Sequence, residues 1–220
     1  YNVTVRETDL FVSTTSDLME LGYKSVILQR SYLESYIKSH PEFLTSLVPL
    51  KNDPFAPDII KDMLICATLA NVGPMASVAG AIARFVGEEL LLHSTDVIVE
   101  NGGDVYIKSD RDILIQIFAG ESRLSNKVVI KIDNKKTPLG VCTSSGTVGP
   151  SLSFGKADAV TVISKSSTLA DAAATSIGNI ISNKSEIKKG IERAQEIDGV
   201  LGVVIIVGDK MGIWGDIELA

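Results

Sequence analysis

The sequence predicts an α+β fold with a mainly antiparallel sheet and packed helices. Segments typical of strands and of helices come in runs rather than in strict alternation, which favours this class over a doubly wound parallel sheet. Apolar residues make up 45% of the chain and aromatic residues only 5%, so Ala, Val, Ile and Leu must form the core. The 220 residues are enough for a single domain over 1–220, or for two intimately packed halves.

The N-terminal part predicts a strand pair and one long helix. Apolar alternation in residues 1–12 indicates two short strands that turn near Glu7. The polar residues 14–17 can cap a helix that runs to about Ser39, with its apolar positions along one side. Three prolines then interrupt the periodicity, so residues 40–56 are expected to be connecting structure.

An uncharged stretch at residues 63–83 is just long enough to cross a bilayer as one helix. Asn71, Gly73, Pro74 and Ser77 lie near its centre, and a proline both removes a helix donor and fixes φ. We therefore expect two shorter buried helices around a turn, and no membrane partner.

The rest of the chain predicts short strands, two helices and a terminal hairpin. A strand, a glycine turn and a strand are expected in residues 96–107, and residues 113–120 are expected to add a third antiparallel strand. The later expected elements are strands at 127–132, 139–144 and 159–164, helices at 167–182 and about 186–197, and a hairpin that turns at Gly208.

Charge and cysteine content exclude several classes of function. Lys and Arg number 21 against 27 Asp and Glu, a balance of −6 that does not suit a nucleic-acid partner. Cys66 and Cys142 lie far apart, so they can build neither a disulfide framework nor a structural zinc site. The given residues begin without a basic and then apolar leader, so we expect a reducing, cytoplasmic location. Self-association through small-residue helix faces such as 78–83 stays open, because the same faces pack equally well inside a monomer.

Two turns combine glycines with polar side chains. In the first, Glu100 to Asp104, paired glycines let backbone amides approach a ligand that the polar side chains orient. The same residues also suit an ordinary hairpin turn. The second turn, Cys142 to Pro150, offers hydroxyl and amide donors to a phosphate. It has neither Walker nor nucleophile-elbow spacing, so an ordinary polar loop is the alternative.

A third candidate site lies on the helix that opens near Ser166. Asp171 and Thr175 are four residues apart, so they share a helix face and can offer two oxygens to one small cation such as Mg²⁺. The alternative is that Asp171 only complements the dipole of its own helix. Cys142 adjoins the second turn, and as a thiolate it could act as a nucleophile or sulfur carrier. Its alternative role is that of a small buried strand residue.

Four segments in order carry a family resemblance. They are VGPMASVAGAIARFVGEEL, VENGGDVYI, TSSGTVG and SSTLADAAATSIGNII. Together they resemble the ApbE superfamily, which includes FAD:protein FMN transferases, and are most similar to its short, uncharacterised branch. The resemblance covers roughly residues 70–183. It implies a T-fold-related α+β pseudo-barrel pair.

The resemblance also implies a set of site residues. Asp171 and Thr175 would be side-chain ligands of Mg²⁺, and Ala76 would add a main-chain carbonyl. A pocket for FAD or a related nucleotide would be lined by Asn101, Gly102, Gly103, Asp104, Ser144, Ser145, Gly146 and Thr147. The partner implied is therefore a small-molecule nucleotide or flavin, and the metal would polarise its pyrophosphate.

The chain departs from the transferase pattern at two places. Ser77 stands where the family's GGIAKG-like turn has a lysine, and Ser145 to Gly149 replaces the SGxYE stretch with no histidine-containing segment after it. We therefore expect binding of a flavin or other nucleotide with a divalent metal, while the departures argue against FMN-transferase activity. Two alternatives stay open. One is a role in sulfur assimilation, namely homocysteine formation with Cys142 as the sulfur carrier, and the other is a non-catalytic ligand-binding module.

Overall fold

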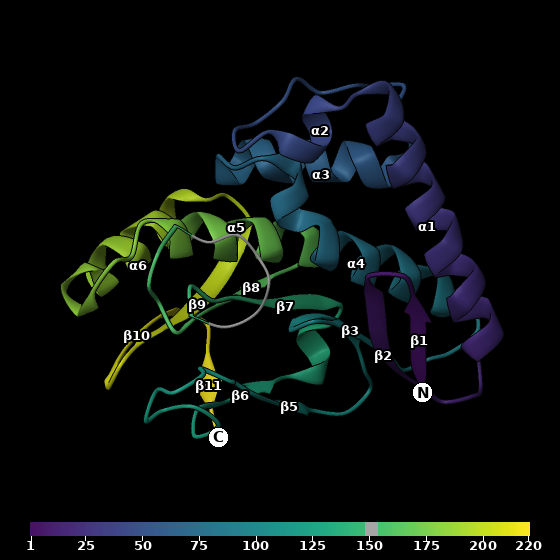
Figure 1. Ribbon diagram of the computed structural model, residues 1–220. Helices are drawn as coiled ribbons and strands as arrows, with labels where there is room; N and C mark the ends of the chain where they lie inside the picture. The colour runs from purple at the N-terminus through teal and green to yellow at the C-terminus, as the bar shows by residue number, and fades with distance from the viewer. Residues whose placement is uncertain (148–153) are drawn as a thin grey trace.

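The computed structural model describes residues 1–147 and 154–220, and its helices gather on one side of a large sheet (Figure 1). The strands are β1 (Asn2–Val5), β2 (Thr8–Thr14), β3 (Val97–Asn101), β4 (Asp104–Lys108), β5 (Ile113–Gln116), β6 (Val129–Ile132), β7 (Leu139–Ser144), β8 (Ala159–Ser164), β9 (Val200–Val207), β10 (Lys210–Gly215) and β11 (Glu218–Leu219). The helices are α1 (Met19–Ser39), α2 (Glu42–Thr45), α3 (Asp58–Ala70), α4 (Val78–Leu90), α5 (Ser167–Asn179) and α6 (Ile187–Glu196). Short 3-10 turns are η1 (Pro74–Ser77), η2 (Asn134–Lys136) and η3 (Lys184–Glu186).

Two antiparallel sheets form the β part of the fold. Within the described residues, eight strands pair in the order β1-β2-β3-β4-β7-β8-β9-β10, and β11, β6 and β5 form a separate three-stranded sheet. Every strand pairing between described residues is antiparallel. The predicted α+β class with a mainly antiparallel sheet and packed helices is therefore confirmed.

The large sheet lies between the helices and the small sheet (Figure 1). Alternate residues of its central strands point to opposite faces, so Val160 and Val203 belong to the same core cluster as the alanines of α5. Ile163 and Val204 belong instead to a cluster with Ile130 of the small sheet. Burial on both faces explains why β9 is an almost continuous apolar run.

Most local predictions from the sequence are confirmed. The N-terminal hairpin is β1 paired with β2, α1 ends at Ser39, and α3 and α4 are separated by the turn at Pro74–Ser77. The N-cap predicted within residues 14–17 is instead Leu18, which has no side-chain cap hydrogen bond, although Asp17 just before it accepts from the N–H of Met19 at 3.0 Å. The connection after α1 contains the short helix α2, which was not predicted because the prolines in that segment interrupt the helical periodicity.

The predicted third strand of a β3-β4 meander is wrong. β4 pairs with β7, while β5 leaves this sheet and pairs with β6. The turn after β4 is hydrogen-bonded to Asp96, whose carboxylate accepts from the Ser109 hydroxyl at 2.7 Å and from the Asp110 N–H at 2.9 Å. These contacts direct the chain out of the large sheet. β5 therefore reaches the other side of a cavity rather than the free edge of β4.

In the part of the chain that the structure describes, no single helix is both long and apolar enough to cross a membrane. The pair Asp58–Ala70 and Pro74–Leu90 reaches that length and composition only together, with a bend of 101° between its members.

Candidate metal and ligand site

Asp171 lies on α5 and reaches the N-terminus of another helix. Its Oδ2 accepts a hydrogen bond from the N–H of Gly80 at 2.9 Å, and the N–H of Ala79 also stabilises its charge. These amides belong to the first turn of α4, whose N–H groups have no partner within their own helix. α5 begins at Ser167, so Asp171 lies beyond its first turn. Asp171 therefore does not stabilise the dipole of its own helix, as the alternative interpretation had it. Its carboxylate lies at the N-terminus of α4 and interacts with the dipole of that helix.

Close packing of the two helices makes this contact possible. A Cβ on Gly80 would lie 2.3 Å from the carbonyl oxygen of Ser167 and 2.8 Å from the Cβ of Asp171, so this position of α4 must be a glycine. Asn101 fixes the same turn from the sheet, because its Nδ2 donates to the carbonyl of Ala79 at 3.1 Å. Asn101 thus supports the N-terminus of α4.

Asp104 begins β4, directly after a two-glycine turn. Gly102 and Gly103 have φ of +63° and +103°, and no atom lies within 4 Å of a Cβ built on either. This is the ordinary hairpin geometry that was the alternative interpretation, and the same turn also lines a cavity. Asp104 is only 8% exposed, and its Oδ1 has no hydrogen-bond partner among the described residues. A buried carboxylate oxygen without a partner is costly, which makes it a strong indicator of a bound cation or proton.

Two buried carboxylates meet at this point. Burial raises the pKa of Asp104 well above its usual range, and the neighbouring Asp171 carboxylate raises it further. Burial also raises the pKa of Asp171 to about 7, although the α4 amides act in the opposite direction. The pair therefore binds a proton tightly at neutral pH and would give it up to a cation.

Asp104, Asp171 and Thr175 separate two cavities. The first, named here the sheet-side cavity, has a volume of about 480 Å³ and lies between β3, β4 and β7 on one side and residues 113–118 on the other. The second, the helix-side cavity, has a volume of about 310 Å³ and is lined by residues of the segments 44–47 and 72–79 with Phe154 and Asn179. These three residues are the ones that line both.

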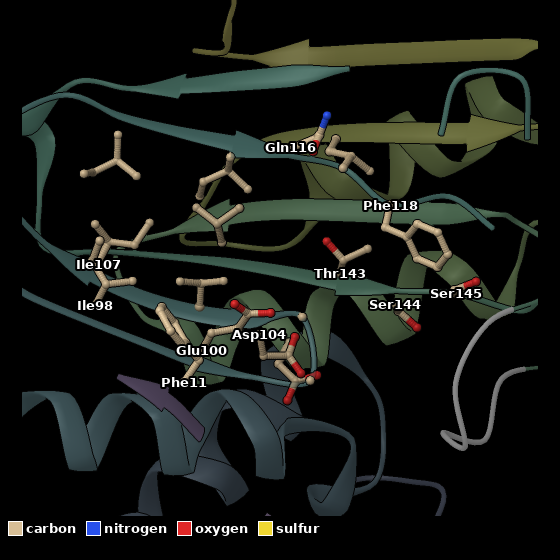
Figure 2. Close-up of a pocket in the computed structure, with 18 of the residues that line it drawn as sticks. Phe11, Ile98, Glu100, Asp104, Ile107, Gln116, Phe118, Thr143, Ser144 and Ser145 are labelled. Carbon is tan, nitrogen blue, oxygen red and sulfur yellow. The ribbon is translucent and has the colours of Figure 1, made fainter. Parts of the chain in front are cut away.

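Figure 2 shows the sheet-side cavity from within. Gln116 and Phe118 lie on one side, and Glu100, Asp104 and Thr143 lie on the other. Neither cavity has a Lys, Arg or His among its described lining residues. An anionic group that enters either of them would therefore meet carboxylates without any cationic side chain.

The structure brings most of the predicted site residues together. Those that line the sheet-side cavity are Gly102, Gly103, Asp104, Ser144, Ser145, Asp171 and Thr175. Ala76 lines the helix-side cavity beside the same three shared residues. Gly146 and Thr147 line neither, because Gly146 donates its N–H to the Ala157 carbonyl at 2.9 Å and the Thr147 hydroxyl donates to Asp158 at 3.2 Å. Residues 148–150 of the predicted loop lie outside the described residues.

The catalytic role suggested for Cys142 is not supported by its position. Its side chain is fully buried in β7, and its Sγ donates to the carbonyl of Ser167 at 3.3 Å. Burial and the nearby Asp104 and Asp171 raise the pKa of the thiol well above its usual range, which disfavours the thiolate that nucleophilic chemistry needs. The alternative interpretation, a small buried strand residue, fits this geometry.

Several residues of the site were missed from the sequence. Residues 113–118 were assigned to the large sheet, so nothing suggested that they form the far wall of a cavity. Phe11 reaches the same cavity from β2. One signal for the close approach was available at Gly80, because a glycine inside a helical pattern often marks tight packing.

The donor set suits a hard divalent cation. Asp104, Asp171 and Thr175 offer carboxylate and hydroxyl oxygens, and the unpartnered Oδ1 of Asp104 leaves one of them free. Mg²⁺ prefers such oxygen ligands and usually retains several waters, so few protein ligands are needed. Over residues 1–147 and 154–220, no group of three or more His, Cys, Asp or Glu residues is placed to hold a metal. The residues present therefore fit a site that a ligand and water complete.

The fold is that of ApbE-type proteins. The chain is similar in structure to the apo form of the flavinyl transferase ApbE of Pseudomonas stutzeri, with a TM-score of 0.58, 16% identity and coverage of 97% of this chain and 92% of that one. It is also similar to a histidine-to-glycine mutant of the flavin transferase ApbE of Vibrio cholerae, with a TM-score of 0.59, 12% identity and coverage of 97% and 95%. At these identities the likeness shows the fold alone.

The chain belongs to the family described as "AbpE bacteria", whose model matches residues 1–211. It is 42% identical to a UPF0280 protein of Methanocaldococcus jannaschii over 98% of this chain and 90% of that protein. It is 39% identical to a UPF0280 protein of Methanococcus aeolicus over 98% and 89%. These findings confirm the resemblance to the ApbE superfamily that the four sequence segments suggested.

Proposed function

We propose that this protein binds a phosphate-bearing flavin, or a related nucleotide, together with a divalent cation at Asp104, Asp171 and Thr175. The observation that carries the proposal is the buried, unpartnered Oδ1 of Asp104 beside a second buried carboxylate, where two cavities meet. A cation there would satisfy this oxygen and replace the proton that the pair otherwise shares.

The absence of basic lining residues in the described part of both cavities supports the need for a cation. A phosphate that entered alone would lie close to two carboxylates, and in a low-dielectric cavity that repulsion is large. A divalent cation bound to Asp104 and Asp171 neutralises their two negative charges and offers its remaining coordination positions to the phosphate. When bound, Mg²⁺ polarises the oxygens of the phosphate that it contacts.

The arrangement of the cavities supports a ligand with two apolar or ring parts joined by a charged link. FAD has this form, with a diphosphate between two ring systems. The Thr143, Ser144 and Ser145 hydroxyls and the Gly102–Gly103 amides could then orient the part in the sheet-side cavity, and the apolar residues of segments 44–47 and 72–79 could enclose the part in the helix-side cavity. The names of the two similar structures, both flavin transferases, support the same class of ligand.

Binding, rather than group transfer, is the activity proposed. Ser77, which stands in place of the family's lysine, is fully buried, and its hydroxyl donates to the carbonyl of Pro74 at 2.8 Å. Ser77 therefore supplies no charge to a phosphate. This observation favours the non-catalytic module among the alternatives that the sequence left open, and the burial of Cys142 argues against a sulfur carrier.

A titration with FAD tests the proposal. Flavin fluorescence is followed with Mg²⁺ and with EDTA for the wild type, Asp104→Asn, and Asp198→Asn as a matched control at an exposed carboxylate with no hydrogen bond or ion pair in the described structure. In Asp104→Asn the amide nitrogen can take the place of Oδ1, which has no partner to lose, while the remaining oxygen can still accept from the Thr143 N–H and the Cys142 thiol. We expect saturable binding that needs Mg²⁺ and weakens by at least about tenfold in Asp104→Asn only.

Chromatography of the same mixtures measures AMP and FMN. Bound FAD that stays intact supports a binding protein, whereas release of AMP and FMN that is lost in Asp104→Asn would show that group transfer persists. Absence of saturable flavin binding by the wild type, or equal binding with EDTA, would contradict the proposed function.

A further inference from the structure

Glu100 presents a free carboxylate to the sheet-side cavity. In β3, Val97 and Val99 are buried on the helix side, so the alternation places Ile98 and Glu100 on the opposite face, which lines the cavity. Figure 2 shows Glu100 on the side of the cavity that also carries Asp104. Among the described residues, no side chain forms a hydrogen bond or an ion pair with the Glu100 carboxylate.

The Glu100 side chain is exposed, and its neighbours on the sheet supply no opposite charge. Its cross-strand partners are Phe11 of β2 and Val105 of β4, and both also line the cavity. A carboxylate can only accept hydrogen bonds, and within residues 1–147 and 154–220 no group donates one to Glu100. A ligand in this cavity is the remaining source of donors besides water.

The polar side chains that line the cavity determine which ligand charges it can accept. Asp104 and Asp171 lie at one end, and the remaining described polar side chains, such as Gln116 and Thr143, are neutral. A cation held at Asp104 and Asp171 can compensate a phosphate there, but it does not neutralise Glu100 four residues earlier in the hairpin. An acidic group on the part of the ligand near Glu100 would therefore be repelled.

We propose that Glu100 is a specificity-determining residue, which accepts hydrogen bonds from N–H donors on the ring of the bound ligand and excludes rings that carry an acidic substituent. This inference rests on the proposed function and narrows its substrate class to phosphate esters of rings with an imide or amine edge. The phosphate lies at Asp104 and Asp171, and the ring occupies the apolar part of the sheet-side cavity.

Three related probes test this assignment: FMN, its N3-methyl derivative and its N3-carboxymethyl derivative. The first has the imide donor, the second lacks it, and the third carries an acid at the same edge. Dissociation constants are measured with Mg²⁺ for the wild type, Glu100→Gln, and Glu89→Gln as the control. Glu89 is exposed on α4 and lines neither cavity.

The wild type and Glu89→Gln should bind FMN at least about tenfold more tightly than the carboxymethyl derivative, because that derivative loses the hydrogen bond and also brings a second negative charge towards Glu100. In Glu100→Gln this ratio should fall to about threefold or less, because glutamine still accepts a hydrogen bond but carries no charge. The methyl derivative should bind with intermediate affinity to the wild type.

Two results would overturn the assignment. One is a ratio between FMN and the carboxymethyl derivative that Glu100→Gln leaves unchanged, and the other is equal binding of all three probes by the wild type. Failure of the wild type to bind both FMN and FAD with Mg²⁺ would instead overturn the proposed function and the assignment of Glu100 with it, whereas binding of FAD without FMN would overturn the assignment alone.

Discussion

Stability should fall as pH rises through the range in which Asp171 ionises. Burial raises the pKa of this carboxyl from 3.8 to about 7 in the folded protein, so the folded state holds a proton that the unfolded state has already lost. Below pH 3.8 both states are protonated and the folded state has no penalty. The penalty grows between the two values, and above pH 7 it reaches at most about 4 kcal/mol, at about 1.4 kcal/mol per pKa unit.

Urea denaturation at pH 5 and pH 8 in EDTA measures this effect. Asp171 ionises in the folded state near pH 7, which is about two pH units above the lower pH of the experiment. Between pH 5 and pH 8 the wild type should therefore lose about 3 kcal/mol of unfolding free energy relative to Asp171→Asn. Asparagine cannot accept from the Gly80 and Ala79 amides as a carboxylate does, but that loss is an offset independent of pH. The difference between the two pH values therefore reports the ionisation of the Asp104–Asp171 pair.

A wild type that gains unfolding free energy between pH 5 and pH 8 relative to Asp171→Asn would refute this reasoning about the buried pair. A loss that differs by less than about 0.5 kcal/mol between the two proteins would refute it as well. Mg²⁺ supplies an independent check at pH 8, because a ligand of the folded state raises the melting temperature. The increase should occur in the wild type and be absent from Asp171→Asn.

Three further experiments test the packing and the site. Gly80→Ala should lower the free energy of unfolding by about 1–3 kcal/mol in thermal melts, because its Cβ would lie 2.3 Å from the carbonyl oxygen of Ser167. The control Gly22→Ala in α1 meets only contacts at 3.5 Å or more, so it should raise the free energy of unfolding by about 0.5–1 kcal/mol. Iodoacetamide should leave buried Cys142 unlabelled in the native protein at pH 8 and label it in urea, and rapid native labelling at this site by mass spectrometry would contradict its burial. Thr175→Val should weaken Mg²⁺ binding by at least about tenfold in calorimetry without changing the melting temperature of the metal-free protein, and equal affinity would remove Thr175 from the ligand set.

Local elements were predictable because their signals are short in sequence. Apolar alternation gave the N-terminal hairpin, and Pro74 divided the uncharged stretch into α3 and α4. The spacing of Asp171 and Thr175 placed both on one face of α5, and both line the same cavities. The four family segments indicated the superfamily, which the match of the family model to residues 1–211 confirms.

The assembly of the site depended on contacts between distant parts of the chain. Asp104 follows a hairpin turn and Asp171 lies on a helix 67 positions later, and only the packing of α5 on the sheet brings their carboxylates together. The same packing places the N-terminus of α4 against Asp171 and buries Cys142. No pattern in the sequence predicted that β5 leaves the sheet of β3 and β4 and forms the opposite wall of the cavity.

The sequence by itself determined most of the strands and helices and the residue types that can ligate a cation. The tertiary structure alone decided which of these residues are buried, which are paired and which face a cavity. Periodicity and turn chemistry act over a few neighbouring residues, whereas the pKa of a carboxyl and the partner of a strand depend on groups that folding brings from elsewhere in the chain. Asp104 illustrates this difference, because a residue of an ordinary glycine turn becomes an unpartnered buried acid only when α5 packs beside it.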